Sequence, residues 1–180
     1  VECMESGHGR VLEYADITVE ISGYSNRCIR ELYTHIVGVS RIQESTRYVD
    51  MSSFDYYIPD SMLNNLDAKE IYDSCMVNIM KTYAKLKDLG IPREDTANLL
   101  PLGSNTKIVL KINARAILNM AENRLCNRAL KEYRELMKEL INKISKLDCE
   151  WAEIMAHAKP KCDIVGYCPE AKSCGKYPNK

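Results

Sequence analysis

A chain of 180 residues predicts one domain with a substantial hydrophobic core. Its 25 lysines and arginines balance 25 aspartates and glutamates, and this neutrality gives no support for binding to a nucleic-acid polymer or an anionic membrane. No apolar run approaches the length of a membrane span, and no signal-peptide pattern is visible at the start. We therefore expect a cytoplasmic protein without membrane contact, in which any anion site is local.

The first third of the chain contains a strand pattern, a helix pattern and a loop. Residues 14–22 alternate between apolar and polar side chains, which predicts a half-buried strand that ends at Gly23. A short helix is expected over residues 27–36, after polar residues that can cap it. Gly38 then opens a loop, and an extended aromatic segment follows as far as Pro59.

Helical patterns dominate the rest of the chain. A long helix is expected over residues 67–89, and a β-branched strand over residues 106–112. One further helical run begins near Ala114, and another covers residues 127–145. The tail, residues 159–180, contains prolines and cysteines and is expected to be irregular. Strands mixed with long helices, without regular β–α–β spacing, predict an α+β fold with a mixed sheet and one domain over the whole chain.

A polar loop follows the short helix, in the segment Gln43-Glu44-Ser45-Thr46-Arg47. Ser45 offers a hydroxyl, Arg47 offers a planar cation, and the backbone between them offers N–H donors. This combination is typical of a site that binds an anion. The approach to the loop, residues 34–39, holds one ionisable side chain, His35, and a lone histidine is more often structural than a ligand.

The helical run after Ile112 is rich in asparagine and arginine. Asparagine is a poor residue in the interior of a helix, so this number of them needs a reason. The residues are Asn113, Arg115, Asn119, Asn123, Arg124, Asn127 and Arg128. Two interpretations stay open: a solvated face, or a polar wall that binds the edges of a flat ligand such as a nucleobase or a flavin.

Eight cysteines are more than a chain of this size usually has. The four that lie late in the sequence are Cys149, Cys162, Cys168 and Cys174. Their spacings are looser than the close pairs of most zinc sites, and nothing else indicates the oxidising compartment that disulfides need. We therefore expect reduced thiols and no bound metal.

Several motifs, in this order along the chain, resemble the flavin-dependent thymidylate synthase family. They are VLEYADITVEISG, then H-x₉-S-x-R-Y, TKIVLKINAR, R-L-C-N-R-A and CPEAKSCG. The resemblance runs from about Ser6 to Gly175, and we expect the usual N-terminal segment of the family to be absent. It implies a homotetrameric α+β flavoprotein whose active site lies between subunits.

The resemblance also implies a reaction and a set of site residues. The family methylates dUMP to dTMP in nucleotide biosynthesis, with FAD, methylenetetrahydrofolate as carbon donor and NADPH as reductant. By position, Arg124 and Ser45 would be catalytic, with Arg124 polarising the uracil. The implied substrate-binding residues are Glu31, Gln43, Glu44, Ser45, Thr46, Arg47 and Arg124. The implied cofactor-binding residues are His8, Arg10, Thr34, His35, Ile36, Gln43, Asn113, Arg115 and Asn119.

The chain departs from the family pattern where the family contacts its ligands. Both arginines of the family's Arg-His-Arg motif are missing, because Thr34 and Ile36 flank His35. Glu31 replaces a glutamine, and Ala97 replaces an arginine. A charged hydrogen bond is worth about 1.5–3 kcal/mol, so these losses predict weak FAD binding and slow or undetectable dTMP formation. The alternative is a catalytically silent or retuned homologue that binds a flavin or nucleotide as a structural or regulatory subunit.

Overall fold

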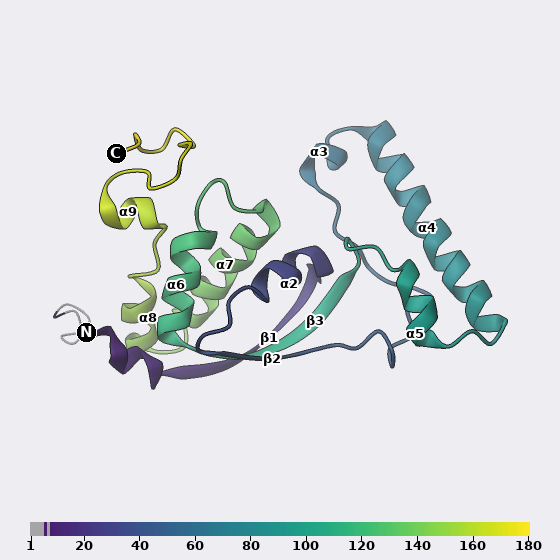
Figure 1. Cartoon of the computed structure of the whole chain (residues 1–180), viewed down its shortest axis with the longest axis horizontal. Coiled ribbons are helices and arrows are strands. Elements are labelled where there is room, and N and C mark those ends of the chain that lie inside the picture. Colours follow the sequence, from purple (N-terminus) through teal and green to yellow (C-terminus); the bar gives the residue numbers. More distant parts are fainter. Residues whose placement is uncertain (1–5, 7) are drawn as a thin grey trace. The chain divides into compact units, whose positions relative to one another are not determined.

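Three strands form a sheet in this computed structural model, which describes residue 6 and residues 8–180 (Figure 1). The strands, in the spatial order β1-β3-β2, are β1 (Asp16–Ser25), β2 (Val39–Gln43) and β3 (Asn105–Asn113). Lys107 pairs with Glu20, and Lys111 pairs with Asp16, so residue numbers rise on β3 as they fall on β1. The α+β class is confirmed, and the sheet is antiparallel where a mixed sheet was expected.

Strand β1 continues to Ser25, beyond its expected end at Gly23. Gly23 lies inside the strand with a φ of 79°, a left-handed value that glycine adopts without strain. A glycine can therefore bend a strand without ending it. Helix α2 (Asn26–Leu32) follows the strand directly and stops before the expected end at Ile36.

Strand β2 occupies a segment that the sequence pattern assigns to a loop. Half-buried and exposed residues alternate along it, but apolar and polar residues do not follow that alternation: Arg41 is half-buried, and Ile42 is 78% exposed. Pairing with β3 holds it in place: the Asn113 N–H donates to the Gly38 carbonyl, and the Glu44 N–H donates to the Lys107 carbonyl. The expectation of a loop beginning at Gly38 is wrong, because a strand without a clear apolar face is recognised only by its partner.

Contacts divide the chain into two compact units, and each unit contains part of every strand. The first unit consists of the described residues up to Val19, with Arg30–Arg41 and Leu110–Lys180. The second unit consists of Glu20–Ile29 and Ile42–Val109. The asparagine-rich helix belongs to the first unit, and the polar loop belongs to the second.

Helices packed around α6 make up most of the first unit. They are η1 (Gly9–Glu13), α6 (Ala114–Arg124), α7 (Lys131–Ile144), α8 (Cys149–Met155) and α9 (Lys161–Val165). Helix α6 contacts η1, α7 and α9, and α7 also contacts α8 (Figure 1). Ile117 and Met120 of α6 and Tyr133 and Met137 of α7 are fully buried, which gives this unit its core.

The connection between α6 and α7 differs from the helix expected over residues 127–145, because α7 begins only at Lys131. Arg134 Nη1 donates to the Asn127 carbonyl at 2.7 Å, and at longer range to the carbonyls of Cys126 and Ala129. These bonds satisfy carbonyl groups at the end of a helix that have no helical partner. A side chain thus stabilises the turn in place of a continuous helix.

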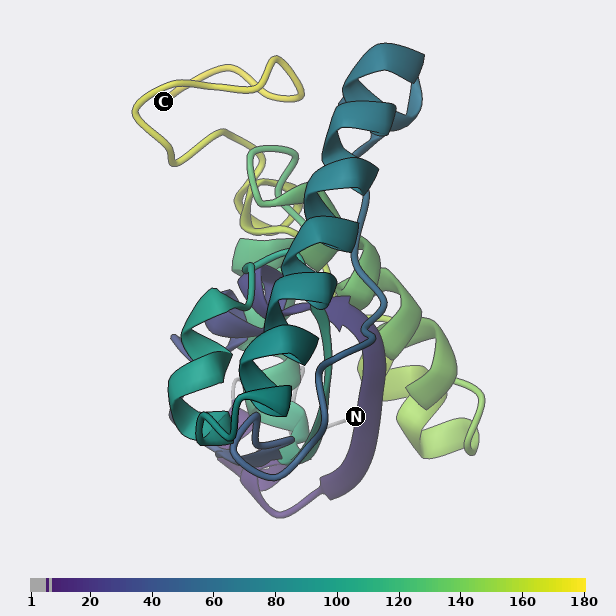
Figure 2. The ribbon, with the colours of Figure 1, turned by 90° about the vertical axis from the view of Figure 1, so that its right-hand side faces the viewer.

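Helix α4 and its neighbours form the second unit. Its elements are α3 (Asp60–Leu63), α4 (Leu66–Asp88), α5 (Arg93–Thr96) and η2 (Ala97–Leu99). Figure 2 shows α5 beside α4, and one apolar cluster joins Met51 and Phe54 to Met76 and Tyr83 of α4. Helix α4 begins and ends within one residue of the expected 67–89. In the described residues, no helix is both long and apolar enough to cross a membrane.

Candidate functional site

Arg124 ends helix α6, and its position follows from the way that helix begins. Asn113 is the last residue of β3 and the N-cap of α6, and its Oδ1 accepts the Ala116 N–H at 2.9 Å. The cap satisfies one of the free N–H groups at the helix start. The strand therefore passes into the helix without a linker, and the eleven residues of α6 end at Arg124.

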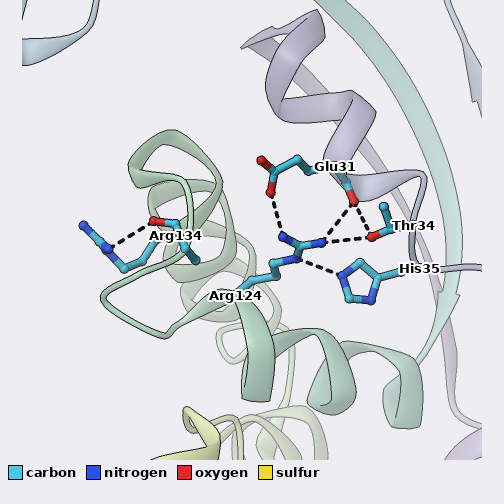
Figure 3. Close-up of polar contacts among 6 residues, drawn as sticks. Glu31, Thr34, His35, Arg124 and Arg134 are labelled. Carbon is cyan, nitrogen blue, oxygen red and sulfur yellow. Dashed lines mark hydrogen bonds and ion pairs between the residues drawn. The ribbon is translucent and has the colours of Figure 1, made fainter. Parts of the chain in front are cut away.

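The guanidinium group of Arg124 is held by the segment that ends α2 (Figure 3). Nη1 donates to the Glu31 carboxylate at 2.6 Å, and Nη2 donates to Thr34 Oγ1 at 2.9 Å. Nε donates to His35 Nε2 at 3.0 Å. These bonds bring four of the expected site residues into one cluster. Only 19% of the Arg124 side chain is exposed there.

An aromatic ring completes this cluster. The Arg124 guanidinium carbon lies 4.8 Å from the centre of the Tyr133 ring, within the range of a cation–π contact. The His35 ring meets the same tyrosine edge-on, with 6.3 Å between centres. Burial, and then the charge of Arg124, lower the pKa of His35. Both effects favour the neutral imidazole, which is the form whose Nε2 can accept the hydrogen bond from Arg124.

A cavity of about 720 Å³ lies beside α6 in the first unit. Asn113, Arg115 and Asn119 line it, as the resemblance implies for a cofactor site. Leu12 of η1 and Val37, before β2, supply apolar walls. The volume falls in the range of small-molecule sites, about 300–1,000 Å³.

The cavity suits the edge of a flat ring better than it suits a diphosphate. The Asn119 amide can both donate and accept a hydrogen bond there. Arg115 is the one cationic side chain among the lining residues, and it already pairs with Glu13 at 2.5 Å. Two acidic residues, Glu13 and Glu122, line the cavity too. The residues present thus fit a flavin ring and offer little net positive charge to its phosphates.

Six of the nine expected cofactor residues are not among those that line the cavity. Thr34 and His35 belong to the Arg124 cluster, and Gln43 belongs to the polar loop. The other three are His8, Arg10 and Ile36. His8 precedes η1 and Arg10 lies within it, and both are exposed. Ile36 is 68% exposed. Of these segments, Gly9 and Val37 line the cavity instead.

The polar loop in the second unit is held by its own contacts. Gln43 Nε2 donates to Asn26 Oδ1 at 2.8 Å, and Arg47 pairs with Glu94 at 3.0 Å. Ser45 Oγ accepts the Arg47 backbone N–H at 3.4 Å. Of the remaining loop residues, Glu44 is exposed and Thr46 is half-buried. An anion bound here would compete with Glu94 for Arg47 and would meet the Ser45 hydroxyl.

Two residues of the Arg124 surroundings are missing from the sequence-based list. Tyr133 appears in the sequence only as part of the apolar face of a helix. Arg41 donates to the His35 carbonyl at 2.9 Å, and its guanidinium carbon lies 4.3 Å from the centre of the Tyr33 ring. No pattern in the sequence marks either role, because both depend on segments that meet only in the folded chain.

Comparisons with known proteins identify the family of this chain. The model of the family described as "Thymidylate synthase complementing protein" matches residues 1–148. A flavin-dependent thymidylate synthase of Nitratidesulfovibrio vulgaris is 34% identical, over 97% of this chain and 74% of that protein. The enzyme of the same name from Pyrococcus abyssi is 33% identical, over 91% of this chain and 69% of that protein.

A solved structure shares the fold. It is the UMP/dUMP methylase PolB from Streptomyces cacaoi, bound with 5-Br dUMP, and it superposes with a TM-score of 0.74 at 20% identity. The match covers 86% of this chain and 77% of that one. The chain therefore belongs to the thymidylate synthase complementing protein family, and it is a flavin-dependent thymidylate synthase-like methyltransferase.

Proposed function

We propose that this protein methylates dUMP at C5 to form dTMP, with FAD as its flavin, methylenetetrahydrofolate as carbon donor and NADPH as reductant. One observation supports this above all: the Arg124 guanidinium is 19% exposed and is oriented by Thr34, His35 and Tyr133. A shielded guanidinium with a fixed plane is suited to polarising the carbonyl of a pyrimidine ring.

The contacts of Arg124 divide into fixed and exchangeable ones. His35 and the Tyr133 ring hold the Nε edge and the face of the guanidinium group. Glu31 occupies Nη1 as an ion pair, so a uracil oxygen would take the place of this carboxylate. The side chain can thus change its partner while it keeps its orientation.

The cavity beside α6 is the proposed flavin site. Asn119 would bond the polar edge of the ring, and Leu12 and Val37 would cover its faces. When bound, the flavin supplies the electrons that convert the transferred one-carbon unit to a methyl group. Arg115 would meet the phosphates only in competition with Glu13, which predicts weak FAD binding.

The polar loop is the proposed site of the nucleotide phosphate, through Ser45 and Arg47. We further propose that the protein is a homotetramer in the cytoplasm, with each active site assembled from several copies. Helix α4 supports this assembly, because Leu66 and Ile71 are large apolar residues exposed on its surface.

Release of tritium from dUMP labelled at C5 tests the reaction, in the presence of FAD, methylenetetrahydrofolate and NADPH. We expect slow release by the native protein and a loss of roughly 100-fold or more in Arg124→Ala, as for other groups that stabilise developing charge. Arg124→Lys keeps the charge without the planar fork and should recover only part of the loss. Lys138→Ala, which removes an exposed cation of α7, is the control and should leave release unchanged.

Two results would contradict the proposal. One is an absence of tritium release from native protein that has bound flavin and dUMP, which would favour a silent or retuned homologue. The other is equal release by the native protein and Arg124→Ala, which would remove Arg124 from the reaction.

A further inference from the structure

Four cysteines surround one small cavity at the end of α6. Its volume is about 50 Å³. The cysteines that line it are Cys126, Cys162, Cys168 and Cys174. Cys149, expected with the late group, lies elsewhere, and its Sγ donates to the Glu150 carboxylate at 3.1 Å. Cys126 takes its place, although it precedes the other three by at least 36 residues.

The four thiols differ in their access to solvent. Cys174 is exposed, Cys126 and Cys162 are half-buried, and Cys168 is buried. The seven cysteines in the described part of the chain are all free thiols. A reagent from solution would therefore meet Cys174 first.

The surroundings of Cys174 favour its thiolate. A hydrogen bond from the Lys176 backbone is the largest cause that lowers its pKa, and the Asn127 amide and the Lys176 ammonium lower it further. Burial, and then Asp163, raise the pKa of Cys162. Because the thiolate is the nucleophile, Cys174 is the more reactive of these two.

Cys174 and Cys126 line the same cavity. Asn127 Nδ2 lies 3.8 Å from the Cys174 sulfur, and Asn127 directly follows Cys126 in the chain. Arg128 lies in the connection between α6 and α7, and its Nη1 donates to the Lys172 carbonyl of the tail at 2.6 Å. Cys174, Gly175 and Lys176 are all exposed, so little packing around them opposes the small movement that would join the two sulfurs.

We propose that this cavity is a thiol–disulfide exchange site, in which Cys174 attacks a low-molecular-weight disulfide and Cys126 then closes an internal disulfide. In the first step, the Cys174 thiolate bonds to one sulfur of the small disulfide, whose S–S bond breaks and releases one thiol. In the second step, the Cys126 thiolate attacks the Cys174 sulfur, and the mixed disulfide breaks and releases the second thiol. Two protein thiols are oxidised, one small disulfide is reduced, and the two protons end on the released thiols.

Metal binding is the rival use of four thiols. Among the residues that the structure describes, no three cysteine, histidine or acidic side chains are grouped so that they could hold a metal ion. A disulfide, unlike a metal site, requires only that two sulfur atoms come into contact. The cations Arg128 and Lys176 line the same cavity, and they favour a thiolate in the absence of metal.

The disulfide would tie the end of α6 to the tail. Cys126 lies two residues after Arg124, so oxidation would restrain the segment that holds the Arg124 guanidinium. The exchange chemistry itself does not depend on the proposed methyltransferase reaction. Its test can therefore succeed or fail separately from the test of dTMP formation.

The experiment treats the reduced full-length protein with oxidised glutathione and follows intact mass and peptide mass with time. We expect the native protein to form a Cys126–Cys174 disulfide. Cys126→Ser should instead retain one glutathione on Cys174. Cys174→Ser should react with glutathione disulfide more slowly by a factor of about ten or greater, because it lacks the activated thiolate.

Cys75→Ser is the matched control, since it removes an exposed thiol from α4 in the second unit and should leave the rate of disulfide formation unchanged. If circular dichroism shows that Cys126→Ser is misfolded, Cys126→Ala replaces it. The proposal is overturned if glutathione modifies the other cysteines as fast as Cys174, or if the internal disulfide omits Cys126. Stoichiometric zinc that blocks the reaction in the purified protein would overturn it as well.

Discussion

At Arg124, the charge that would bind a ligand is already matched by a carboxylate. The Glu31 and Arg124 side chains are 35% and 19% exposed, so water screens their ion pair only in part. A ligand oxygen must compete with Glu31 for Nη1. The replacement of a glutamine by Glu31, noted in the sequence, therefore acts on ligand affinity through Arg124.

Removing the charge of Glu31 should strengthen nucleotide binding. In Glu31→Gln, Arg124 keeps its contacts with Thr34 and His35 but loses the competing carboxylate. We expect the Kd for dUMP to fall about tenfold, since a hydrogen bond to a charged group is worth about 1.5–3 kcal/mol. Isothermal titration calorimetry measures the change. Glu139→Gln, which removes an exposed ion pair with Lys143 on α7, is the control; an equal effect there would refute the prediction.

Restoring positive charge near the cavity should strengthen FAD binding, and Ile36 is the better position for it. Thr34 Oγ1 accepts a hydrogen bond from Arg124, so an arginine there would lose this contact and add a like charge. Ile36 is 68% exposed, so its replacement costs little packing. We expect Ile36→Arg to lower the Kd for FAD about tenfold, measured by flavin fluorescence.

The exposed Ile42 of β2 provides the matched control for this change. Ile42→Arg adds the same charge at an exposed position inside β2, whereas Ile36 precedes that strand, and it should change FAD affinity less. The double variant Thr34→Arg plus Ile36→Arg should gain less than Ile36→Arg alone. The reverse order of these affinities would show that position 34 faces the ligand.

His35 should make the stability of the protein depend on pH. Its pKa in the folded protein is below the ordinary value of 6.5, because of burial and then the Arg124 charge. The unfolded chain therefore binds a proton more readily, and stability is full above about pH 6.5 and falls as the pH drops toward the folded pKa. We expect the urea concentration at the midpoint of unfolding to fall as the pH is lowered from about 8 to about 5. This fall should be steeper for the native protein than for His35→Gln. The exposed His157→Gln should keep the native slope.

At the scale of the element, one side chain both begins α6 and lines the cavity. The Asn113 side chain caps α6 through the Ala116 N–H. Gly38 lies so close to the same amide that a Cβ added to Gly38 would be 2.5 Å from Asn113 Nδ2. The amide is therefore held between the start of α6 and Gly38. Asn65 caps α4 in the same way, with 3.1 Å from its Oδ1 to the Ala68 N–H. The two caps thus form a natural pair for comparison.

Replacing either cap should cost similar stability, but only one replacement should affect the ligand. We expect Asn113→Ala and Asn65→Ala each to lower the free energy of unfolding by about 1 kcal/mol, the usual contribution of an N-cap. Chemical denaturation measures this loss. Asn113→Ala alone should weaken FAD binding, because Asn113 lines the cavity. Equal weakening in Asn65→Ala would show that the effect comes from general destabilisation.

At the scale of the whole molecule, helix α4 leaves much apolar surface uncovered. Of its 23 residues only Met76 and Tyr83 are buried, and Ile71 is 72% exposed. Such a surface is typical of a helix that packs against another copy of the chain. We expect light scattering to give the mass of a tetramer for the native protein. Ile71→Asp should shift the mass downward, whereas Lys81→Asp, a charge change on the same helix, should not. A stable native monomer at micromolar concentration would contradict the composite site.

The sequence by itself determined the family, the α+β class and the helices whose signals are local. Motif order and spacing are read directly along the chain, and a helix such as α4 is bounded by caps and hydrogen bonds within a few residues. The bounds of α4 were therefore predicted within one residue, and the strand–helix junction at Asn113 was also close.

The tertiary structure alone decided which side chains meet. Strand β2 exists because β3 lies beside it, and Arg124 finds Glu31 across 93 positions of sequence. Cys126, rather than Cys149, joins the tail cysteines because α6 and α9 pack together. Local hydrogen bonds leave a pattern within one turn or one strand. Contacts between distant segments leave none, because packing of the complete chain decides them.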